Sequence, residues 1–355
     1  MVKTRRLSPS KLLSVLLAGG VSLFSFSATL AQTASPNSSA SVVVASTSKK
    51  ADPLPVTEIE LMTNSQPSAL ALDARDGAIW FAAPPLGALG RIDSETQKIT
   101  YLYLGKRAKP FGLAFGPDGA LYATDKTLNV LHRIDGTTGE LTRIAMPSDL
   151  PMMDLSGLRA DGLGRIWFAG SAGWLGKYDS QSGAVEVSSH DDLQGLGLNA
   201  PGEGGAIWFS AWKAGRMIRL DPTRGRFDST ALPESFRGAR GLSTGPQGEI
   251  WVSSAKSNAI ARSTGRGAWR IITLPWPDSQ PQALLARSDG TVIVADGGRR
   301  MLLRYRPQTN VFEEIAALGE GGLIRAMIET RNGIAYADSG GDDIRFVPDR
   351  RPAEN

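Results

Sequence analysis

Short hydrophobic runs alternate with turn-forming residues over most of the chain, and one run recurs. Gly164-Arg-Ile-Trp167-Phe has counterparts in which an aromatic or aliphatic marker follows the glycine by two or three positions. The markers are Trp80, Tyr122, Trp167, Trp208, Trp251, Ile293 and Ala335. Successive markers are separated by 41 to 45 residues. A repeat of this length is typical of a four-stranded propeller blade.

Each repeat contains the pattern of four strands. A short apolar strand such as 112–115 leads through a Gly-Pro-Asp-Gly turn at 116–119 into the strand that carries the marker. Such turns between apolar runs predict hairpins. A third strand places a basic residue beside an apolar one, as in Arg133-Ile134, and a fourth alternates apolar and polar residues, as expected of an edge. The pattern predicts an all-β protein.

The last repeat lacks a fourth strand, and an extra strand precedes the first repeat. The chain ends soon after Asp343-Ile-Arg-Phe, whereas residues 56–61 have the character of a fourth strand. We therefore predict a seven-bladed β-propeller of four-stranded antiparallel blades, with 56–61 completing the last blade and closing the ring. The competing interpretation, an open solenoid, would need polar caps at its ends, and none is evident.

The N-terminal region differs from the repeats. A basic start, an apolar segment from Leu12 and Thr29-Leu-Ala31 predict a cleaved signal peptide over 1–31, with an uncleaved anchor as the alternative. Residues 32–52 are rich in Ser and Ala and predict a flexible tether. The propeller is expected over 53–348 and a short tail over 349–355. The expected location is the periplasm or the medium, through the Sec route rather than the twin-arginine route.

Charge and composition exclude several classes of protein. The formal net charge of +4 is accounted for by Lys3, Arg5, Arg6 and Lys11, so the predicted mature protein is neutral and nucleic acid is not an expected partner. With no cysteine, the chain forms no disulfide and no haem attachment. The Gly-rich runs do not join a strand to a helix, which argues against a nucleotide. We expect a monomer without a transmembrane segment after signal cleavage.

The repeat resembles that of a known family. Pro110-Phe-Gly-Leu, Gly119-Ala-Leu-Tyr, Arg133-Ile-Asp and Gly139-Glu-Leu-Thr are similar to the repeat of the streptogramin B lyases, and the resemblance extends over about 53–348. It implies a propeller that opens a cyclic ester by magnesium-assisted elimination at one mouth of the central channel. The family's histidines match Gln282 and Arg325 here, and its acidic positions match Asp125, Asp296 and Asp338. Because neither Gln nor Arg is an ordinary base near neutral pH, the implied mechanism lacks its imidazoles.

Several residues are expected at that mouth. The three aspartates could hold Mg²⁺ or Ca²⁺ through oxygen ligands, or could instead cap turns. Arg240 and Arg325 could bind a carboxylate or phosphate, or could pair with the aspartates. Phe111 and Gln282 occupy equivalent positions on other blades and are further binding candidates.

Two loops beside the mouth add candidates. Trp174 and Trp212 are expected in neighbouring loops, where they could form an aromatic wall for a ligand or pack between blades. His190 is the one imidazole expected within reach of the mouth, with an exposed loop histidine as the alternative. His132, in a third strand, is expected to be structural.

Two functions follow from these residues. One is a metal-assisted C–O lyase or lactonase, with Asp296 and Asp338 on the metal and Arg325 polarising the carbonyl. The other is a non-catalytic periplasmic propeller that binds a small ligand or a protein at the channel mouth.

Overall fold

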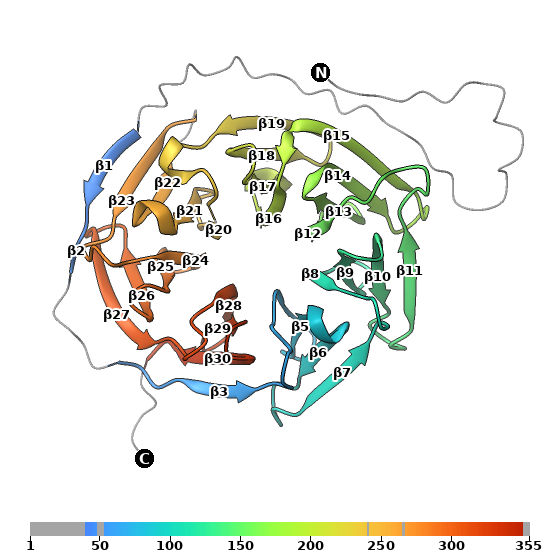
Figure 1. Ribbon diagram of the computed structural model, residues 1–355, viewed down its shortest axis with the longest axis horizontal. Helices are drawn as coiled ribbons and strands as arrows, with labels where there is room; N and C mark the ends of the chain where they lie inside the picture. The colour runs from blue at the N-terminus through green and yellow to red at the C-terminus, as the bar shows by residue number, and fades with distance from the viewer. Residues whose placement is uncertain (1–39, 48–52, 240, 265–266, 351–355) are drawn as a thin grey trace, which may run out of the picture.

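The structure, a computed structural model, describes residues 40–47, 53–239, 241–264 and 267–350. The predicted signal peptide, most of the predicted tether, Arg240 and the last five residues lie outside this description. The described strands form seven sheets arranged in a ring around a central axis, with the first of the four antiparallel strands of each blade innermost (Figure 1). The prediction of a seven-bladed propeller is confirmed. No helix among the described residues has the length and apolar character needed to cross a membrane.

The first four blades follow the chain directly. Blade 1 contains β4 (Leu70–Leu72), β5 (Ile79–Ala83), β6 (Ala88–Ile92) and β7 (Ile99–Tyr103). Blade 2 contains β8 (Pro110–Phe115), β9 (Leu121–Asp125), β10 (Val130–Ile134) and β11 (Leu141–Ala145). Blade 3 contains β12 (Leu155–Ala160), β13 (Arg165–Gly170), β14 (Ala172–Asp179) and β15 (Val185–Gln194). Blade 4 contains β16 (Leu196–Pro201), β17 (Ile207–Ala211), β18 (Arg216–Asp221) and β19 (Arg226–Ala231).

The last three blades recruit the N-terminal segment. Blade 5 contains β20 (Gly241–Thr244), β21 (Ile250–Ser254), β22 (Ala259–Ser263), β23 (Trp269–Thr273) and an added β1 (Ala40–Val44). Blade 6 contains β24 (Pro281–Ala286), β25 (Val292–Asp296), β26 (Met301–Arg306), β27 (Val311–Ala317) and an added β2 (Ser46–Thr47). Blade 7 contains β28 (Ile324–Thr330), β29 (Gly333–Asp338), β30 (Asp343–Pro348) and β3 (Thr57–Glu60).

Short 3₁₀ turns occur between some strands. They are η2 (Pro84–Leu86), η3 (Glu203–Gly205), η4 (Glu234–Phe236) and η5 (Ala255–Ser257).

Ring closure occurs as predicted. β3 pairs antiparallel with β30, with Thr57 opposite Phe346 and Glu60 opposite Asp343. Ile59 and Leu61 are buried in the core between blades 7 and 1. A strand that precedes the first blade in the chain therefore supplies the outer strand of the last blade.

The structure differs from the predicted tether at residues 40–47, here called the N-terminal strap. β1 runs parallel to β23 and β2 runs parallel to β27, so the strap adds a fifth strand to blades 5 and 6. Ala45 is 5% exposed and packs in the core between these blades. The prediction rested on a composition poor in apolar surface, but backbone pairing with an exposed sheet edge needs little apolar surface.

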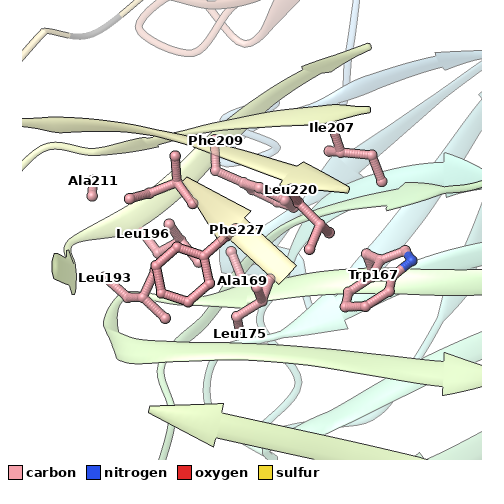
Figure 2. Close-up of a cluster of buried hydrophobic side chains, with 11 residues drawn as sticks. Trp167, Ala169, Leu175, Leu193, Leu196, Ile207, Phe209, Ala211, Leu220 and Phe227 are labelled. Carbon is pink, nitrogen blue, oxygen red and sulfur yellow. The ribbon is translucent and has the colours of Figure 1, made fainter. Parts of the chain in front are cut away.

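Seven hydrophobic clusters fill the spaces between neighbouring blades. Figure 2 shows the cluster between blades 3 and 4, in which Trp167 of blade 3 lies near Leu220 of blade 4, and Leu175 of blade 3 lies near Phe227 of blade 4. Trp167 and Trp251 are almost completely buried. The repeated marker therefore fills space between sheets, as its apolar pattern predicts.

Candidate functional site

A cavity of about 470 Å³ lies at the centre of the ring. All seven inner strands contribute to its wall, which is made mainly of Ala, Leu, Phe and Gly residues. Because every blade has the same order of strands and begins with its inner strand, the inner strands start at one mouth of the cavity and run toward the other. Of the predicted site residues, Phe111 and Arg325 line this cavity.

Phe111 lies near the start of β8, at the mouth where the inner strands begin. The Lys126 ammonium lies 3.9 Å from the centre of the Phe111 ring. Lys126 also lies 3.7 Å from the Asp154 carboxylate. A cation over the ring face favours one orientation of the ring, so Phe111 forms a fixed aromatic surface at the mouth.

Gln282 joins neighbouring blades. Its side-chain oxygen accepts a hydrogen bond of 3.1 Å from the Ile324 amide of blade 7. Its backbone oxygen accepts one of 2.9 Å from the Ser253 hydroxyl of blade 5. Gln282 is absent from the cavity wall formed by the described residues. Arg240, the remaining predicted residue of this ring position, lies outside the described residues.

Asp125 is completely buried at the end of β9 and accepts four hydrogen bonds. Its oxygens receive the amides of Lys109, Thr127 and Leu128 at 2.8 to 3.0 Å and the His132 ring nitrogen at 3.1 Å. Burial works against ionisation, but His132 and the three amides outweigh it and hold the pKa of Asp125 below its ordinary value. The carboxylate therefore fastens the loop before β8 to the turn after β9.

Asp296 and Asp338 occupy the same position in blades 6 and 7. Asp296 accepts the amides of Gln280, Gly298 and Arg299 through Oδ1. Asp338 accepts the amides of Gly322, Leu323 and Gly340. Each of these two carboxylates joins the loop before the inner strand to the turn after the second strand, as Asp125 does in blade 2. All three aspartates therefore cap turns, which was the alternative to metal binding.

These carboxylates do not fit a metal site. Within the described part of the chain, no group of three His, Asp or Glu side chains is placed to hold a metal ion. Asp296 Oδ2 is buried without a hydrogen-bond partner, but it is a single free oxygen, whereas Mg²⁺ and Ca²⁺ require several oxygen ligands. The oxygens of the other two aspartates are already occupied by backbone amides.

The two histidines lie away from the cavity wall. His132 is fully buried in β10 beside Asp125, which agrees with the structural role expected for it. His190 belongs to β15, the outermost strand of blade 3, where its ring packs edge-on against Phe227 at 5.6 Å. Its Nδ1 accepts the Asp192 amide. Sequence reasoning placed His190 in a crossover near the mouth, but β15 extends through this position.

The two tryptophans do not form a wall at the cavity. Trp174 belongs to β14 rather than to a loop, stands opposite Gly170 and packs against the core between blades 2 and 3. Trp212 follows β17, is 42% exposed and lies 5.3 Å from the Lys213 ammonium. Trp174 packs between blades, which was the alternative to an aromatic wall. It does so because β14 begins at Ala172, earlier than the turn pattern suggested, and so includes Trp174.

Sequence reasoning missed two residues of the cavity wall, Arg159 and Asn199. Arg159 Nε donates a hydrogen bond of 2.9 Å to Asn199 Oδ1, which links the inner strands of blades 3 and 4. The available signal was register: Arg159 stands opposite Trp167, a position that is uncharged on the other inner strands.

Comparison with known proteins gives one recurring relative. No family model matches the chain. A virginiamycin B lyase of Nocardia farcinica (strain IFM 10152) is 26% identical over 187 residues, which is 52% of this chain and 62% of that protein. The chain resembles the streptogramin B lyases.

Solved structures of streptogramin lyases have the same fold. The virginiamycin B lyase of Staphylococcus aureus gives a TM-score of 0.74 at 20% identity, covering 83% of this chain and 99% of that one. Another structure, of a streptogramin B lyase, gives a TM-score of 0.74 at 19% identity, covering 84% of this chain and 98% of that one. One Staphylococcus aureus structure is a catalytically inactive histidine-to-alanine variant with quinupristin. At this identity the likeness to solved structures establishes the propeller fold alone.

Proposed function

We propose that this protein is a small-molecule-binding propeller that takes an organic ligand into its central cavity. The observation that carries the proposal is the cavity itself, whose volume of about 470 Å³ lies within the range of small-molecule sites. Most of the side chains that line it are apolar, and Phe111 adds an aromatic surface at one mouth. These side chains can contact the apolar part of a ligand.

The arrangement of titratable groups favours binding over elimination. Proton abstraction needs a base within hydrogen-bond reach of the substrate. No histidine, aspartate or glutamate belongs to the cavity wall formed by the described residues. The carboxylates nearest the start of the inner strands accept backbone hydrogen bonds instead.

A C–O lyase that opens a cyclic ester antibiotic or a lactone is the second candidate. The sequence similarity to a virginiamycin B lyase supports it, and Arg325 at the cavity wall could polarise a carbonyl. In this alternative Asp296 and Asp338 would have to leave their backbone partners to reach a metal, and His190 would have to leave Phe227.

A fluorescence titration with dansylamide, a neutral apolar probe, tests the binding proposal. Apart from its two chain neighbours, the nearest described atom to a Cβ added at Gly197 would be the Gly195 carbonyl oxygen, at 3.7 Å. Gly197→Phe can therefore fill the cavity without a clash at its Cβ. We expect dansylamide to bind the wild type and to lose at least about ten-fold in affinity in Gly197→Phe, because the ring occupies its volume. Gly162→Phe is the matched control, because Gly162 lies in an exposed turn where an added Cβ would meet no atom of the described residues within 4 Å.

Equal binding by the wild type and Gly197→Phe, or no binding by either, would contradict the cavity as the site. The lyase is tested separately by incubating the protein with quinupristin in Mg²⁺ or in EDTA and analysing the products by mass spectrometry. We expect no ring opening in either condition. Magnesium-dependent opening that Asp296→Ala abolishes would establish the lyase instead.

A further inference from the structure

Arg159 and Asn199 differ from the residues at the same register positions on the other inner strands. Arg159 stands opposite Trp167, and the residues at its register position on the other inner strands are uncharged: Ala71, Ala114, Ala200, Ser243, Leu285 and Ile328. Asn199 occupies the preceding register position, where the other blades place Leu70, Leu113, Leu158, Leu242, Leu284 and Met327. The two exceptions lie on neighbouring blades and are hydrogen-bonded to each other.

The contact between them orients the guanidinium. Asn199 Oδ1 accepts the Arg159 Nε hydrogen at 2.9 Å, which leaves the two terminal amino groups of the guanidinium without a hydrogen-bond partner among the described residues. These groups can donate a parallel pair of hydrogen bonds to a carboxylate. Gly157 makes room for the arrangement, because a Cβ there would lie 2.7 Å from the Asn199 amide nitrogen.

The charge of Arg159 is not neutralised within the described residues. Burial lowers the pKa of Arg159 to about 10, and no acidic neighbour counters that effect. Arg287 shows the usual solution, since its side chain is 7% exposed and lies within 4.0 Å of the carboxylates of Glu329, Asp349 and Asp289. A partly buried cation without an anion is costly, and a bound anion would remove that cost.

We propose that Arg159, positioned by Asn199, binds the carboxylate of a small organic ligand whose apolar part fills the remaining cavity. The proposal rests on the proposed function, because it assigns a ligand class to the same cavity. One guanidinium neutralises one carboxylate, whereas a phosphate dianion would need a second cation nearby. The other charged residue of the wall is Arg325. It lies three positions before Ile328, the residue of blade 7 that corresponds to Arg159, which is about 10 Å along a strand.

A matched pair of probes tests the assignment. Dansylglycine and dansylamide share one fluorophore, and only the first carries a carboxylate. In low-salt buffer at pH 7 we expect dansylglycine to bind the wild type roughly ten- to a hundred-fold more tightly than dansylamide does, as a charge-assisted contact requires. Arg159→Met should abolish this preference and leave dansylamide binding within about two-fold of the wild type.

Two further variants separate a charge effect from a folding effect. Arg159→Lys keeps the positive charge and should keep a measurable part of the preference for dansylglycine. Arg224→Met removes an arginine whose side chain is 76% exposed in the turn between β18 and β19, and it should leave the preference unchanged. Thermal unfolding of each variant shows whether the ring is intact.

The outcomes distinguish the carboxylate subsite at Arg159 from the proposed ligand binding in the cavity as a whole. If dansylamide binds and Gly197→Phe weakens it, but Arg159→Met retains the preference for dansylglycine, the proposed function stands and the Arg159 assignment is wrong. If neither probe binds the wild type, both proposals are wrong. Loss of the preference in Arg159→Met together with its retention in Arg159→Lys establishes the carboxylate subsite.

Discussion

At the scale of single residues, one position at the end of the second strand serves the architecture of several blades. Asp125, Asp296 and Asp338 each join the backbone before the inner strand to the turn after the second strand. In blade 5 the Ser254 hydroxyl makes a comparable link to the Ser235 carbonyl. The acidic character of this position is thus accounted for by unpaired backbone amides, which buried loops must satisfy.

Asp125 and His132 form a fully buried pair, which makes a direct test possible. We expect Asp125→Ala to lower the free energy of unfolding by roughly 3–5 kcal/mol, because it leaves the His132 ring and three amides without their acceptor. Urea denaturation measures the change. In a double-mutant cycle, His132→Ala should cost less in the Asp125→Ala background than in the wild type. Additive losses would show that the two side chains are not coupled.

Gly157 allows the inner strands of blades 3 and 4 to approach closely. A Cβ at Gly157 would lie 2.1 Å from the Gly197 carbonyl oxygen, and backbone cannot move aside as a side chain can. We expect Gly157→Ala to cost about 1–3 kcal/mol of unfolding free energy. Gly162→Ala adds a Cβ that meets no atom of the described residues within 4 Å, so it serves as the control and should change stability by no more than about 0.5 kcal/mol. Equal effects of the two substitutions would contradict the close approach.

At the scale of elements, the N-terminal strap covers edges that the ring leaves exposed. Its backbone pairs with β23 and β27, and Asn310 holds the junction by donating to the Val44 carbonyl and accepting from the Tyr305 hydroxyl. Unpaired outer edges are places where another chain can add a strand. In blades 5 and 6 the chain fills that place with its own segment.

Alternate residues of the strap face opposite environments, and this supplies a matched pair of substitutions. Ala45 is 5% exposed among the core residues of blades 5 and 6, whereas Val44 is 71% exposed. We expect Ala45→Asp to release the strap, because a carboxylate would be buried without a partner. Hydrogen exchange at the Ala45 amide, which donates to the Thr273 carbonyl, reports the release. Val44→Asp should leave that exchange unchanged. Faster exchange in both variants would contradict the assignment of Ala45 to the core and of Val44 to the surface.

The elements that could be predicted from the sequence are those whose signal is repeated. Seven copies of the marker strand and the displaced strand 56–61 were enough for the fold and its closure. The strap was missed because it occurs once and pairs through its backbone. The site was predicted less well. Phe111 and Arg325 could be placed at the cavity because they lie near the start of an inner strand. The Arg159–Asn199 contact could not, because it depends on which residues neighbouring blades bring together.

At the scale of the whole molecule, aspartates in turns make stability depend on pH. Asp93 accepts the amides of Thr96 and Glu95 and the Thr96 hydroxyl, and the Thr96 amide makes the largest contribution to lowering its pKa to about 2. The pKa is also lowered at Asp73, Asp125, Asp135, Asp179 and Asp221. At Asp343 burial raises the pKa, an effect of opposite sign.

These shifts predict loss of stability in acid. A carboxyl group whose folded pKa lies below its unfolded value of 3.8 stabilises the fold above pH 3.8, and this contribution is lost as pH falls through the folded pKa. We expect the urea midpoint to be nearly constant from about pH 6 to 5 and to fall steadily between about pH 4 and 2. Asp93→Asn should show a shallower fall, since it does not titrate. A midpoint that is level or rising below pH 4 would contradict this prediction.

The route of the N-terminal segment has a consequence for the order in which the molecule forms. β1, β2 and β3 pair with residues 269–273, 311–312 and 343–346, so the earliest strands of the domain have their partners among its last blades. Val44 and Asn310, which meet at the strap, are 266 positions apart. During synthesis these strands remain unpartnered until almost the whole propeller has left the ribosome. Joining the two ends is therefore a late, slow event of high contact order, and until then the strands remain available for non-native pairing.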